Sequence, residues 1–378
     1  MNIVISIDSF KGSVSSMQAG NSIKHGILKV YPNACVSVFP LADGGEGTVD
    51  ALCSDEQLFS VKVNGPLMQE VTAKYGLTED KTAVIEIAQA VGLPLVPTEK
   101  RNPLYTSSYG VGQIIKDAIK NGARKFIIGI GGSSTNDGGI GMLSALGFEF
   151  MDKDGKPVNN CALGLADLYS INTDKVMPEL SECTFEIACD VDNPLCGERG
   201  CSAVFSPQKG ALPEDIVKMD KWLEKYALLS KVVNPNADKD RPGAGAAGGL
   251  GFAFNTFLNS SLHSGIEIIT DHLKIEKTIK EADIVITGEG RLDSQTVMGK
   301  APMGITKLAK KYDIPVIGFC GCVSDDASIC NENGIDAFFP ALRKIVSLED
   351  ALDVKNTIKN LSDTAEQVFR LIKSLKKV

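Results

Sequence analysis

The stretch Asn2-Ile-Val-Ile-Ser-Ile7-Asp8-Ser-Phe-Lys-Gly-Ser13, together with the helical pattern that follows it, decides the fold class expected for this chain. Asn2–Ile7 is a short apolar run, which predicts a strand, and Asp8–Ser13 is a polar turn. Cys35–Leu41 predicts the next strand. The helical pattern between the two strands places these apolar residues of Val14–Tyr31 on one side: Val14, Met17, Ile23, Ile27 and Val30. This alternation predicts a parallel sheet with helices on both faces.

The last third of the chain returns to the same alternation. Strands are expected at Asp283–Thr287, Ile314–Gly318 and Asp336–Phe339, with helices over most of Thr296–Lys311 and over Asn356–Lys376. Because both ends share one pattern, the economical architecture is a single α/β domain built from both termini, with a second domain inserted.

The middle of the chain has a different pattern. Phe59–Val63, Val71–Leu77 and Val84–Ile87 are short strands broken by the turn Asn64-Gly65-Pro66, which predicts a meander. A helix over 107–121 and a β-branched strand at Lys125–Ile130 follow. We therefore predict an α/β protein of two domains: residues 1–57 and 270–378 form the parallel-sheet domain, and residues 58–269 form the inserted mixed α/β domain.

Composition excludes several classes of function. The chain has 378 residues, with 39 Lys+Arg against 47 Asp+Glu and a net charge of −8, so neither nucleic acid nor an anionic membrane surface is an expected partner. The N-terminus has no signal-peptide pattern, and the uncharged stretch from Pro242 to Ile266 is too rich in Gly, Asn and Ser to span a bilayer. A cytoplasmic protein is expected, with its ten cysteines reduced and its three histidines too scattered for a zinc site.

Five polar, Gly-rich loops follow apparent strands. In an open α/β sheet, ligands bind at the carboxyl ends of the strands, where such loops lie. Gly and Ser backbone N–H groups suit phosphate, Lys and Arg suit phosphate or carboxylate, and Asp and Glu suit Mg²⁺. Each loop alone has a plain alternative as a turn, but five together favour phosphate chemistry. They are Asp8–Ser13, Asp43–Thr48, Gly131–Gly139, Asp190–Gly197 and Gly288–Thr296.

Familiar fingerprints fit poorly. Gly299-Lys-Ala lacks the upstream Gly and the hydroxyl of a P-loop. A formal G-x-G-x-x-G is present at Gly243, Gly245 and Gly248, but it follows Asp238-Lys-Asp-Arg-Pro242 instead of a strand. This context favours a flexible hinge or a close-packed loop over a dinucleotide-binding site. No G-x-S-x-G is present, which disfavours Ser-His-Asp hydrolysis.

In their order along the chain, these loops resemble the bacterial glycerate kinase family that contains the glycerate 2-kinases of glycerate and glucarate catabolism. The matching stretches run from end to end. They are Asp8-Ser-Phe-Lys-Gly, Ala42-Asp-Gly-Gly-Glu-Gly-Thr, Gly129-Ile-Gly-Gly-Ser-Ser-Thr-Asn-Asp-Gly-Gly, Ala188-Cys-Asp-Val-Asp-Asn-Pro-Leu, Phe205-Ser-Pro-Gln-Lys-Gly-Ala, Pro242-Gly-Ala-Gly-Ala-Ala-Gly-Gly-Leu-Gly, Thr287-Gly-Glu-Gly-Arg-Leu-Asp-Ser-Gln-Thr and Gly299-Lys-Ala-Pro.

The resemblance implies an ATP-dependent kinase that phosphorylates D-glycerate, on the 2-hydroxyl in preference to the 3-hydroxyl. It implies a flavodoxin- or Rossmann-like domain with an inserted domain and an active site in the cleft between them. ATP, Mg²⁺ and D-glycerate would be its small-molecule partners. The sequence leaves open whether the protein forms a homo-oligomer. A nicotinamide-dependent oxidoreductase of a small hydroxy acid and a non-catalytic sugar-acid sensor are the alternatives from other classes.

Phosphoryl transfer needs an oriented hydroxyl, positioned phosphates and neutralised charge. We expect Asp190 to be the base, with Asp192 its rival or a metal ligand and Lys11 on phosphate. The alternatives are an Asx-turn cap for Asp190, local turn bonding for Asp43, Glu289 and Asp293, helix capping for Lys11, Gly131–Ser134 and Asn136, and a structural ion pair for Arg291. The expected substrate contacts are Ser9, Asp43, Asn136 and Arg291; the nucleotide or phosphate contacts are Lys11, Gly131, Gly132, Ser133, Ser134, Gly288 and Gly290; and the metal ligands are Asp43, Glu289 and Asp293.

Overall fold

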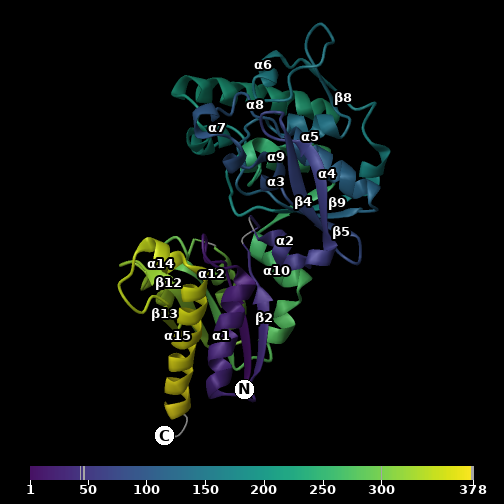
Figure 1. Ribbon diagram of the computed structural model, residues 1–378. Coiled ribbons are helices and arrows are strands. Elements are labelled where there is room, and N and C mark those ends of the chain that lie inside the picture. Colours follow the sequence, from purple (N-terminus) through teal and green to yellow (C-terminus); the bar gives the residue numbers. More distant parts are fainter. Residues whose placement is uncertain (43, 46, 299, 376–378) are drawn as a thin grey trace. The chain divides into compact units, whose positions relative to one another are not determined.

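The computed structural model describes residues 1–42, 44–45, 47–298 and 300–375 (Figure 1). The chain divides into two compact units: unit 1 is Met1–Asp43, Asp50–Leu52 and Ile266–Val378, and unit 2 is Gly44–Val49 and Cys53–Gly265. The predicted α/β fold class, with a parallel sheet in one part and a mixed sheet in the other, is confirmed. The domain boundaries at 57/58 and 269/270, and the cleft between the domains, stay predictions.

Unit 1 is built on a five-stranded parallel sheet in the order β13-β12-β11-β1-β2. Its strands are β1 (Asn2–Ile7), β2 (Cys35–Pro40), β11 (Ile284–Leu292), β12 (Val316–Val323) and β13 (Ala337–Pro340). Numbered within the unit, this is the flavodoxin-like order 2-1-3-4-5. Strand order reverses between β1 and β11, which are paired from Ile3–Ile284 to Ile5–Ile286. Ligands of such sheets bind beyond the carboxyl ends of the strands at this reversal.

Helices cover both faces of this sheet. On one face, α1 (Ser16–Val30) and α15 (Val354–Leu375) lie side by side (Figure 1) and share a core with the strands. A Cβ at Gly26 of α1 would lie 2.1 Å from the carbonyl oxygen of Ser362, so this close approach requires glycine. Met17 is 37% exposed and lies outside the buried stripe to which the sequence pattern assigned it. On the other face, α12 (Ala301–Lys310) packs in a second core.

The sequence explains where α1 begins. Ser15 and Gln18 form a capping box, in which each side chain accepts a hydrogen bond from the other's backbone N–H. The remaining helices that belong wholly or partly to this unit are short. They are α2 (Thr48–Leu52), α10 (Gly265–His272), α11 (Ile275–Ile279), α13 (Ile329–Glu332) and α14 (Leu348–Leu352).

Unit 2 is built on a six-stranded mixed sheet in the order β10-β9-β6-β5-β4-β3. The pairs from β10 to β5 are parallel, and β5, β4 and β3 form the antiparallel meander that the sequence predicted. Its strands are β3 (Leu58–Asn64), β4 (Glu70–Leu77), β5 (Thr82–Glu86), β6 (Lys125–Gly129), β9 (Thr184–Ala188) and β10 (Ser260–His263), with β7 (Glu149–Met151) and β8 (Ser170–Asn172) forming a separate antiparallel pair.

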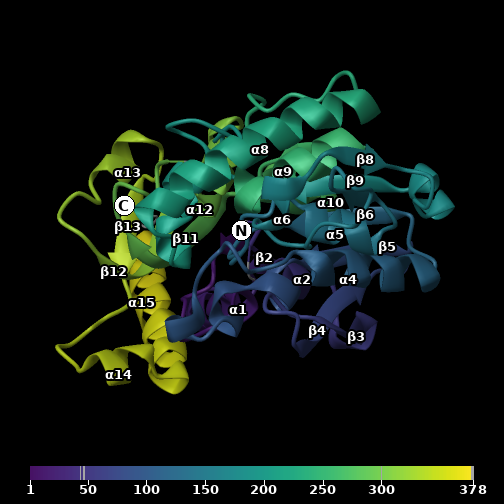
Figure 2. The same cartoon turned by 90° about the horizontal axis from the view of Figure 1, so that it is seen from above.

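Aromatic contacts hold the core of unit 2 together. Phe126 of β6 and Phe185 of β9 stack with ring centroids 4.7 Å apart. The long helix α8 (Pro213–Val233) lies beside α9 (Ala246–Phe257), as Figure 2 shows, and Tyr226 meets Phe252 edge-on. The other helical segments are α3 (Ala88–Val91), α4 (Tyr109–Lys120), α5 (Ile140–Ala145), α6 (Gly164–Asp167) and α7 (Cys201–Phe205), and the 3₁₀ turns are η1 (Asp55–Gln57), η2 (Leu93–Leu95), η3 (Thr98–Lys100), η4 (Pro178–Glu182) and η5 (Pro207–Lys209).

Strands β11 and β12 both run past their predicted ends, to Leu292 instead of Thr287 and to Val323 instead of Gly318. The two strands extend together because their later residues pair, from Gly288–Phe319 to Leu292–Val323. The helix expected from Thr296 begins only at Ala301. Among the described residues, no helix is both long enough and apolar enough to cross a membrane.

Candidate functional site

A cavity of about 400 Å³ lies in unit 1 where the strand order reverses. Its volume is within the range of small-molecule sites. Polar residues reach it from the ends of β1 and β11, and apolar residues reach it from the segment between β13 and α15. It is lined by Asp8, Ser9, Phe10, Lys11, Ser13, Glu289, Gly290, Arg291, Asp293, Lys300, Gly321, Cys322, Ala341, Leu342, Leu348, Ala351, Leu352, Thr357 and Asn360.

The loop after β1 forms one side of this cavity. The Asp8 N–H donates to the carbonyl oxygen of Gly288 (2.9 Å), which joins the loop to β11 at the reversal. The Ser9 N–H donates to Asp8 Oδ1 (2.6 Å), and the Ser13 and Thr357 hydroxyls lie 2.7 Å apart. Lys11 is exposed at the cavity. Two predicted site residues, Ser9 and Lys11, are therefore brought together here.

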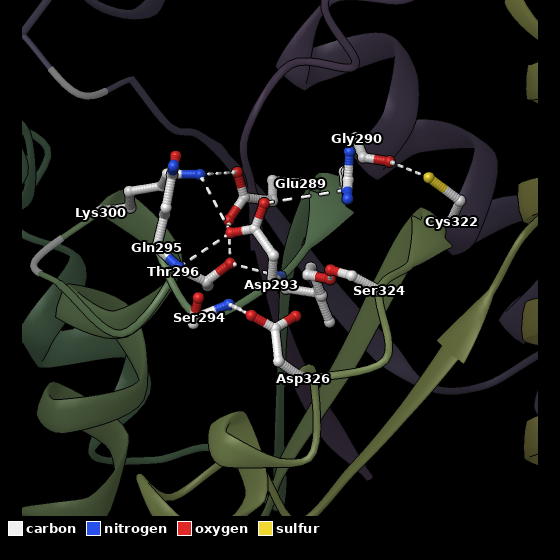
Figure 3. Close-up of polar contacts among 12 residues, drawn as sticks. Glu289, Gly290, Asp293, Ser294, Gln295, Thr296, Lys300, Cys322, Ser324 and Asp326 are labelled. Carbon is white, nitrogen blue, oxygen red and sulfur yellow. Dashed lines mark hydrogen bonds and ion pairs between the residues drawn. The ribbon is translucent and has the colours of Figure 1, made fainter.

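The end of β11 forms a charged cluster beside that loop (Figure 3). Lys300 Nζ lies 3.2 Å from Glu289 Oε2 and 3.8 Å from Asp293 Oδ1. Glu289 Oε1 also accepts a hydrogen bond from the Thr296 hydroxyl (2.7 Å), and Arg291 Nε lies 3.8 Å from Asp293 Oδ2. The two predicted metal ligands of this segment thus share one cation, the ammonium of Lys300.

The loop after β12 supports this cluster. Asp326 Oδ2 accepts a hydrogen bond from the Ser294 N–H (3.1 Å), as Figure 3 shows. The Ser324 hydroxyl donates to the Leu292 carbonyl oxygen (3.0 Å). Hydrogen bonds from Ser294 and Ser324 hold the pKa of Asp326 below its usual value. The segment that carries Asp293 is therefore tied to a neighbouring strand loop.

The two predicted glycines of β11 have different surroundings. A Cβ at Gly288, whose φ is +146°, would lie 1.7 Å from the Phe319 carbonyl oxygen, and Gly288 is absent from the cavity lining. A Cβ at Gly290 would make only ordinary contacts, 3.6 Å from Phe10 Cα and 3.8 Å from Lys11 N, and Gly290 does line the cavity. Strand pairing explains Gly288, while Gly290 faces the site.

Unit 2 brings a second group of predicted residues together. Gly129 of β6 pairs with Ala188 of β9, so the loops that begin at Gly131 and at Asp190 leave the sheet from neighbouring strands. Gly44 and Gly45 cross this edge. A Cβ at Gly129 would lie 2.3 Å from the Gly44 carbonyl oxygen, and one at Gly131 would lie 3.1 Å from Gly45 Cα. Three loops that are separate in the sequence therefore meet. Asp43 and Glu46, in the loop predicted as Asp43–Thr48, lie outside the described residues.

The two candidate bases have different partners. Asp190 is exposed, and its Oδ1 accepts a hydrogen bond from the Gly265 N–H (3.1 Å). Asp192 is bound through both oxygens by one nitrogen of Arg199, at 2.9 and 3.0 Å, in an exposed pair. Asp192, predicted as a rival base or a metal ligand, is thus held in an exposed ion pair with Arg199 that the sequence did not predict.

Asn136, an expected substrate contact, lies in the interior of unit 2. Its side chain is fully buried, and its amide donates to the Ser202 hydroxyl (2.8 Å). The neighbouring Asp137 is also fully buried and accepts hydrogen bonds from the Ser108 N–H and hydroxyl and from the Gly139 and Gly141 N–H groups. Burial raises the pKa of Asp137, although these hydrogen bonds act to lower it. Asp137 joins the starts of α4 and α5.

The sequence prediction assigned no role to three charged residues that lie at these sites. Lys300 lies in Gly299-Lys-Ala-Pro and Lys209 in Phe205-Ser-Pro-Gln-Lys-Gly-Ala, two stretches that carry the family resemblance, and this was the available signal. Glu86 ends β5 and accepts hydrogen bonds from the Gly47 and Val49 N–H groups, at 3.0 and 2.9 Å. No sequence pattern singles out Glu86.

A metal site made by the protein alone is absent from the part of the chain that the structure describes, where no three His, Cys, Asp or Glu side chains lie close enough to hold an ion. Glu289 and Asp293 remain as a pair of carboxylates around one cation position. Mg²⁺ in phosphoryl-transfer sites is commonly held by one or two carboxylates together with substrate phosphates. This donor set therefore fits Mg²⁺ that arrives with a nucleotide.

Fold and site together define an open α/β protein with a small-molecule cavity at its strand reversal and an inserted unit that carries a Gly/Ser loop. Residues 3–373 match the model of the glycerate kinase family. The chain is 44% identical to glycerate kinase from Haemophilus influenzae, covering 98% of this chain and 99% of that one, and 46% identical to glycerate 2-kinase from Escherichia coli K12, covering 93% of each. The crystal structure of a protein assigned as glycerate kinase 2 from Salmonella typhimurium LT2 has a TM-score of 0.90 and 44% identity over the whole of both chains. The chain belongs to the glycerate kinase family, as its motifs predicted.

Proposed function

We propose that this protein is an ATP-dependent kinase that phosphorylates D-glycerate on its 2-hydroxyl and releases 2-phosphoglycerate. Family membership over nearly the full chain is the observation that carries the proposal. The relative from Escherichia coli is named a glycerate 2-kinase, which favours the 2-position over the 3-position.

The cavity of unit 1 is the candidate nucleotide site. Its apolar wall includes Leu342, Leu348 and Leu352, and a flat base would pack well against such side chains. Its polar wall offers Lys11 and the backbone at Gly290 to the phosphates. Because the charged and apolar walls belong to one cavity of about 400 Å³, one amphipathic ligand of nucleotide type suits it.

Glu289 and Asp293 are the residues that would hold Mg²⁺. The ion, when bound, neutralises charge on the transferring phosphoryl group. Lys300, already paired with both carboxylates, keeps them close together and is available to phosphate oxygens. Thr296 orients Glu289 through its 2.7 Å hydrogen bond.

Asp190 is the proposed base, accepting the proton of the reacting hydroxyl of glycerate. It is exposed at the carboxyl edge of the unit 2 sheet, and the Gly265 N–H orients its carboxylate. Asp192 is a weaker candidate because Arg199 holds both of its oxygens. Arg291, 63% exposed and only loosely paired with Asp293, is the proposed partner of the glycerate carboxylate.

The decisive experiment incubates the protein with ATP, Mg²⁺ and D-glycerate and identifies the product by phosphorus NMR. We expect ADP and 2-phosphoglycerate in equal amounts. A 3-phosphoglycerate signal would move the reaction to the other hydroxyl, and ATP that stays intact would refute the kinase. Omitting D-glycerate measures background hydrolysis.

The nicotinamide alternative loses its structural basis. The glycines at 243, 245 and 248 are preceded by turns rather than by a strand. Ala247, Gly248 and Gly249 have φ between +52° and +96°, so the segment is a kinked entry into α9. In a parallel assay with an oxidised nicotinamide cofactor and D-glycerate, we expect no reduction of the cofactor.

A further inference from the structure

Lys209 is a buried lysine for which the proposed reaction has no use so far. It ends η5, and only 3% of it is exposed. Its Nζ donates hydrogen bonds to the Ser133 hydroxyl (3.0 Å) and to the Thr135 carbonyl oxygen (2.7 Å). It therefore lies directly behind the loop that begins at Gly131, within unit 2.

The charge of Lys209 has no counter-ion in the described part of the chain, where no carboxylate forms an ion pair with it. Asp137 is the acidic residue that interacts electrostatically with Lys209 without contacting it. Its carboxylate already accepts four hydrogen bonds from other groups. The other titratable neighbour is Cys201, whose burial raises the pKa of its thiol to about 12, so it is neutral at pH 7. Buried charges are as a rule paired, so an ammonium in this position indicates an anion that comes from outside the chain.

The loop in front of Lys209 has the donors that such an anion needs. Gly131 and Gly132 are exposed, and Ser133 is 8% exposed. Within the described ranges, the backbone N–H groups of these three residues donate to no protein acceptor. Because the Ser133 oxygen accepts from Lys209, its own proton remains available to a ligand.

The loop is held in place by contacts that leave these donors available. The Ser134 N–H and hydroxyl both donate to the Val91 carbonyl oxygen at 2.8 Å, and the Leu93 N–H donates to the Gly132 carbonyl oxygen at 2.9 Å. Gly132 has a φ of +73°, a left-handed conformation that favours glycine. Successive N–H groups in such a turn form a concave nest for anions.

We propose that Lys209 is the buried counter-charge of an oxyanion site formed by the backbone N–H groups of Gly131, Gly132 and Ser133 and by the Ser133 hydroxyl. The ligand group is a phosphoryl or a carboxylate group of a small molecule. Lys209 acts through Ser133 and is a positioning residue. Only the identity of the ligand rests on the proposed glycerate kinase function, since the site follows from the chain's own donors and charge.

The test measures binding directly, by calorimetry of the whole protein with sulfate, ADP and D-glycerate in separate titrations. Lys209→Met removes the charge and keeps an unbranched chain. Loss of a charge-assisted contact should weaken binding of the recognised group roughly tenfold to hundredfold. The matched control is Lys221→Met, which removes an exposed lysine of α8 and should leave all three affinities unchanged.

The pattern of losses identifies the ligand group. Weaker D-glycerate binding with unchanged ADP binding assigns a carboxylate, and the reverse assigns a phosphoryl group. Lys209→Arg should restore part of the lost affinity, which a merely structural defect would not do. Unchanged affinities for all three probes in folded Lys209→Met would overturn the proposal.

Wild-type protein supplies a second test that does not require the variant to fold. Burial lowers the pKa of Lys209 to about 8, and a bound anion should raise that pKa again. Sulfate does not itself titrate near pH 8, so its binding there should take up roughly half a proton, measured in buffers of different ionisation enthalpy. Sulfate binding without proton uptake would count against Lys209. These measurements need no turnover, so they stand apart from the outcome of the kinase assay.

Discussion

The two glycines of β11 allow a structural requirement to be separated from a functional one. In Gly288→Ala, the added methyl carbon would lie 1.7 Å from the Phe319 carbonyl oxygen and 2.7 Å from its carbon. Both atoms belong to the paired strand β12, so neither can move without opening the sheet. Overpacking costs about 1–3 kcal/mol or more, and a strained φ such as +146° adds about 1–3 kcal/mol. We expect Gly288→Ala to lower the free energy of unfolding by about 4 kcal/mol.

Gly290→Ala is the matched variant, two residues along the same strand. Its methyl would make ordinary contacts with Phe10 and Lys11 at 3.6 and 3.8 Å, so the free energy of unfolding should change by less than about 0.5 kcal/mol. The methyl would enter the cavity wall beside Lys11. There it should raise the KM for ATP roughly tenfold, because one methyl group in a well-fitted site is worth about 1–3 kcal/mol.

Urea unfolding, followed by far-UV circular dichroism, measures the first quantity, and initial rates against ATP concentration measure the second. A loss of less than about 1 kcal/mol in Gly288→Ala would refute the strand-pairing argument. An unchanged KM for ATP in Gly290→Ala would refute the proposal that this cavity binds the nucleotide.

The other predictions concern four polar side chains. Lys11→Ala should raise the KM for ATP about tenfold with unfolding unchanged, while the exposed α12 control Lys307→Ala should not; equal effects would contradict a phosphate role. Asp190→Asn should lower kcat by about 10²–10⁴ with an unaltered circular dichroism spectrum, and near-normal turnover would exclude it as the base. Asp137→Ala leaves four hydrogen-bond donors without an acceptor and should lower the free energy of unfolding by about 3 kcal/mol. A decrease of less than about 1 kcal/mol in urea unfolding would be inconsistent with this network. Lys209 has a folded-state pKa of about 8 against an ordinary 10.5, so the native state binds fewer protons than the unfolded state between these values. Wild-type stability should therefore rise with pH across that window by about 3 kcal/mol relative to Lys209→Met, and parallel pH profiles in urea would contradict a buried charge.

Much of the fold could be predicted because local sequence patterns indicate where its strands and helices lie. The strands β1 and β6 and the helices α1 and α15 lie within one or two residues of their predicted bounds, since each has a mainly apolar run or an apolar stripe. The continuation of β11 through Gly288 and Gly290 was not readable. Glycines ordinarily weaken a strand, and only pairing with β12 extends this one.

Part of the candidate site could likewise be predicted from the sequence, and part could not. The sequence identified Ser9, Lys11, Glu289, Arg291 and Asp293 as polar residues after strands, and the sheet order placed them around one cavity. It could not show that Gly288 serves strand pairing, because the atom that excludes a side chain belongs to Phe319, 31 residues along the chain.

By itself, the sequence determined the α/β class and the family and gave a prediction of the loops that carry the chemistry, because periodicity and short motifs are local properties of the chain. The tertiary structure alone decided which loops share an edge of a sheet and which charges are buried. Lys209 shows the reason: its ammonium contacts the Ser133 hydroxyl 76 residues away, and burial and missing counter-charge exist only after the chain has folded around both.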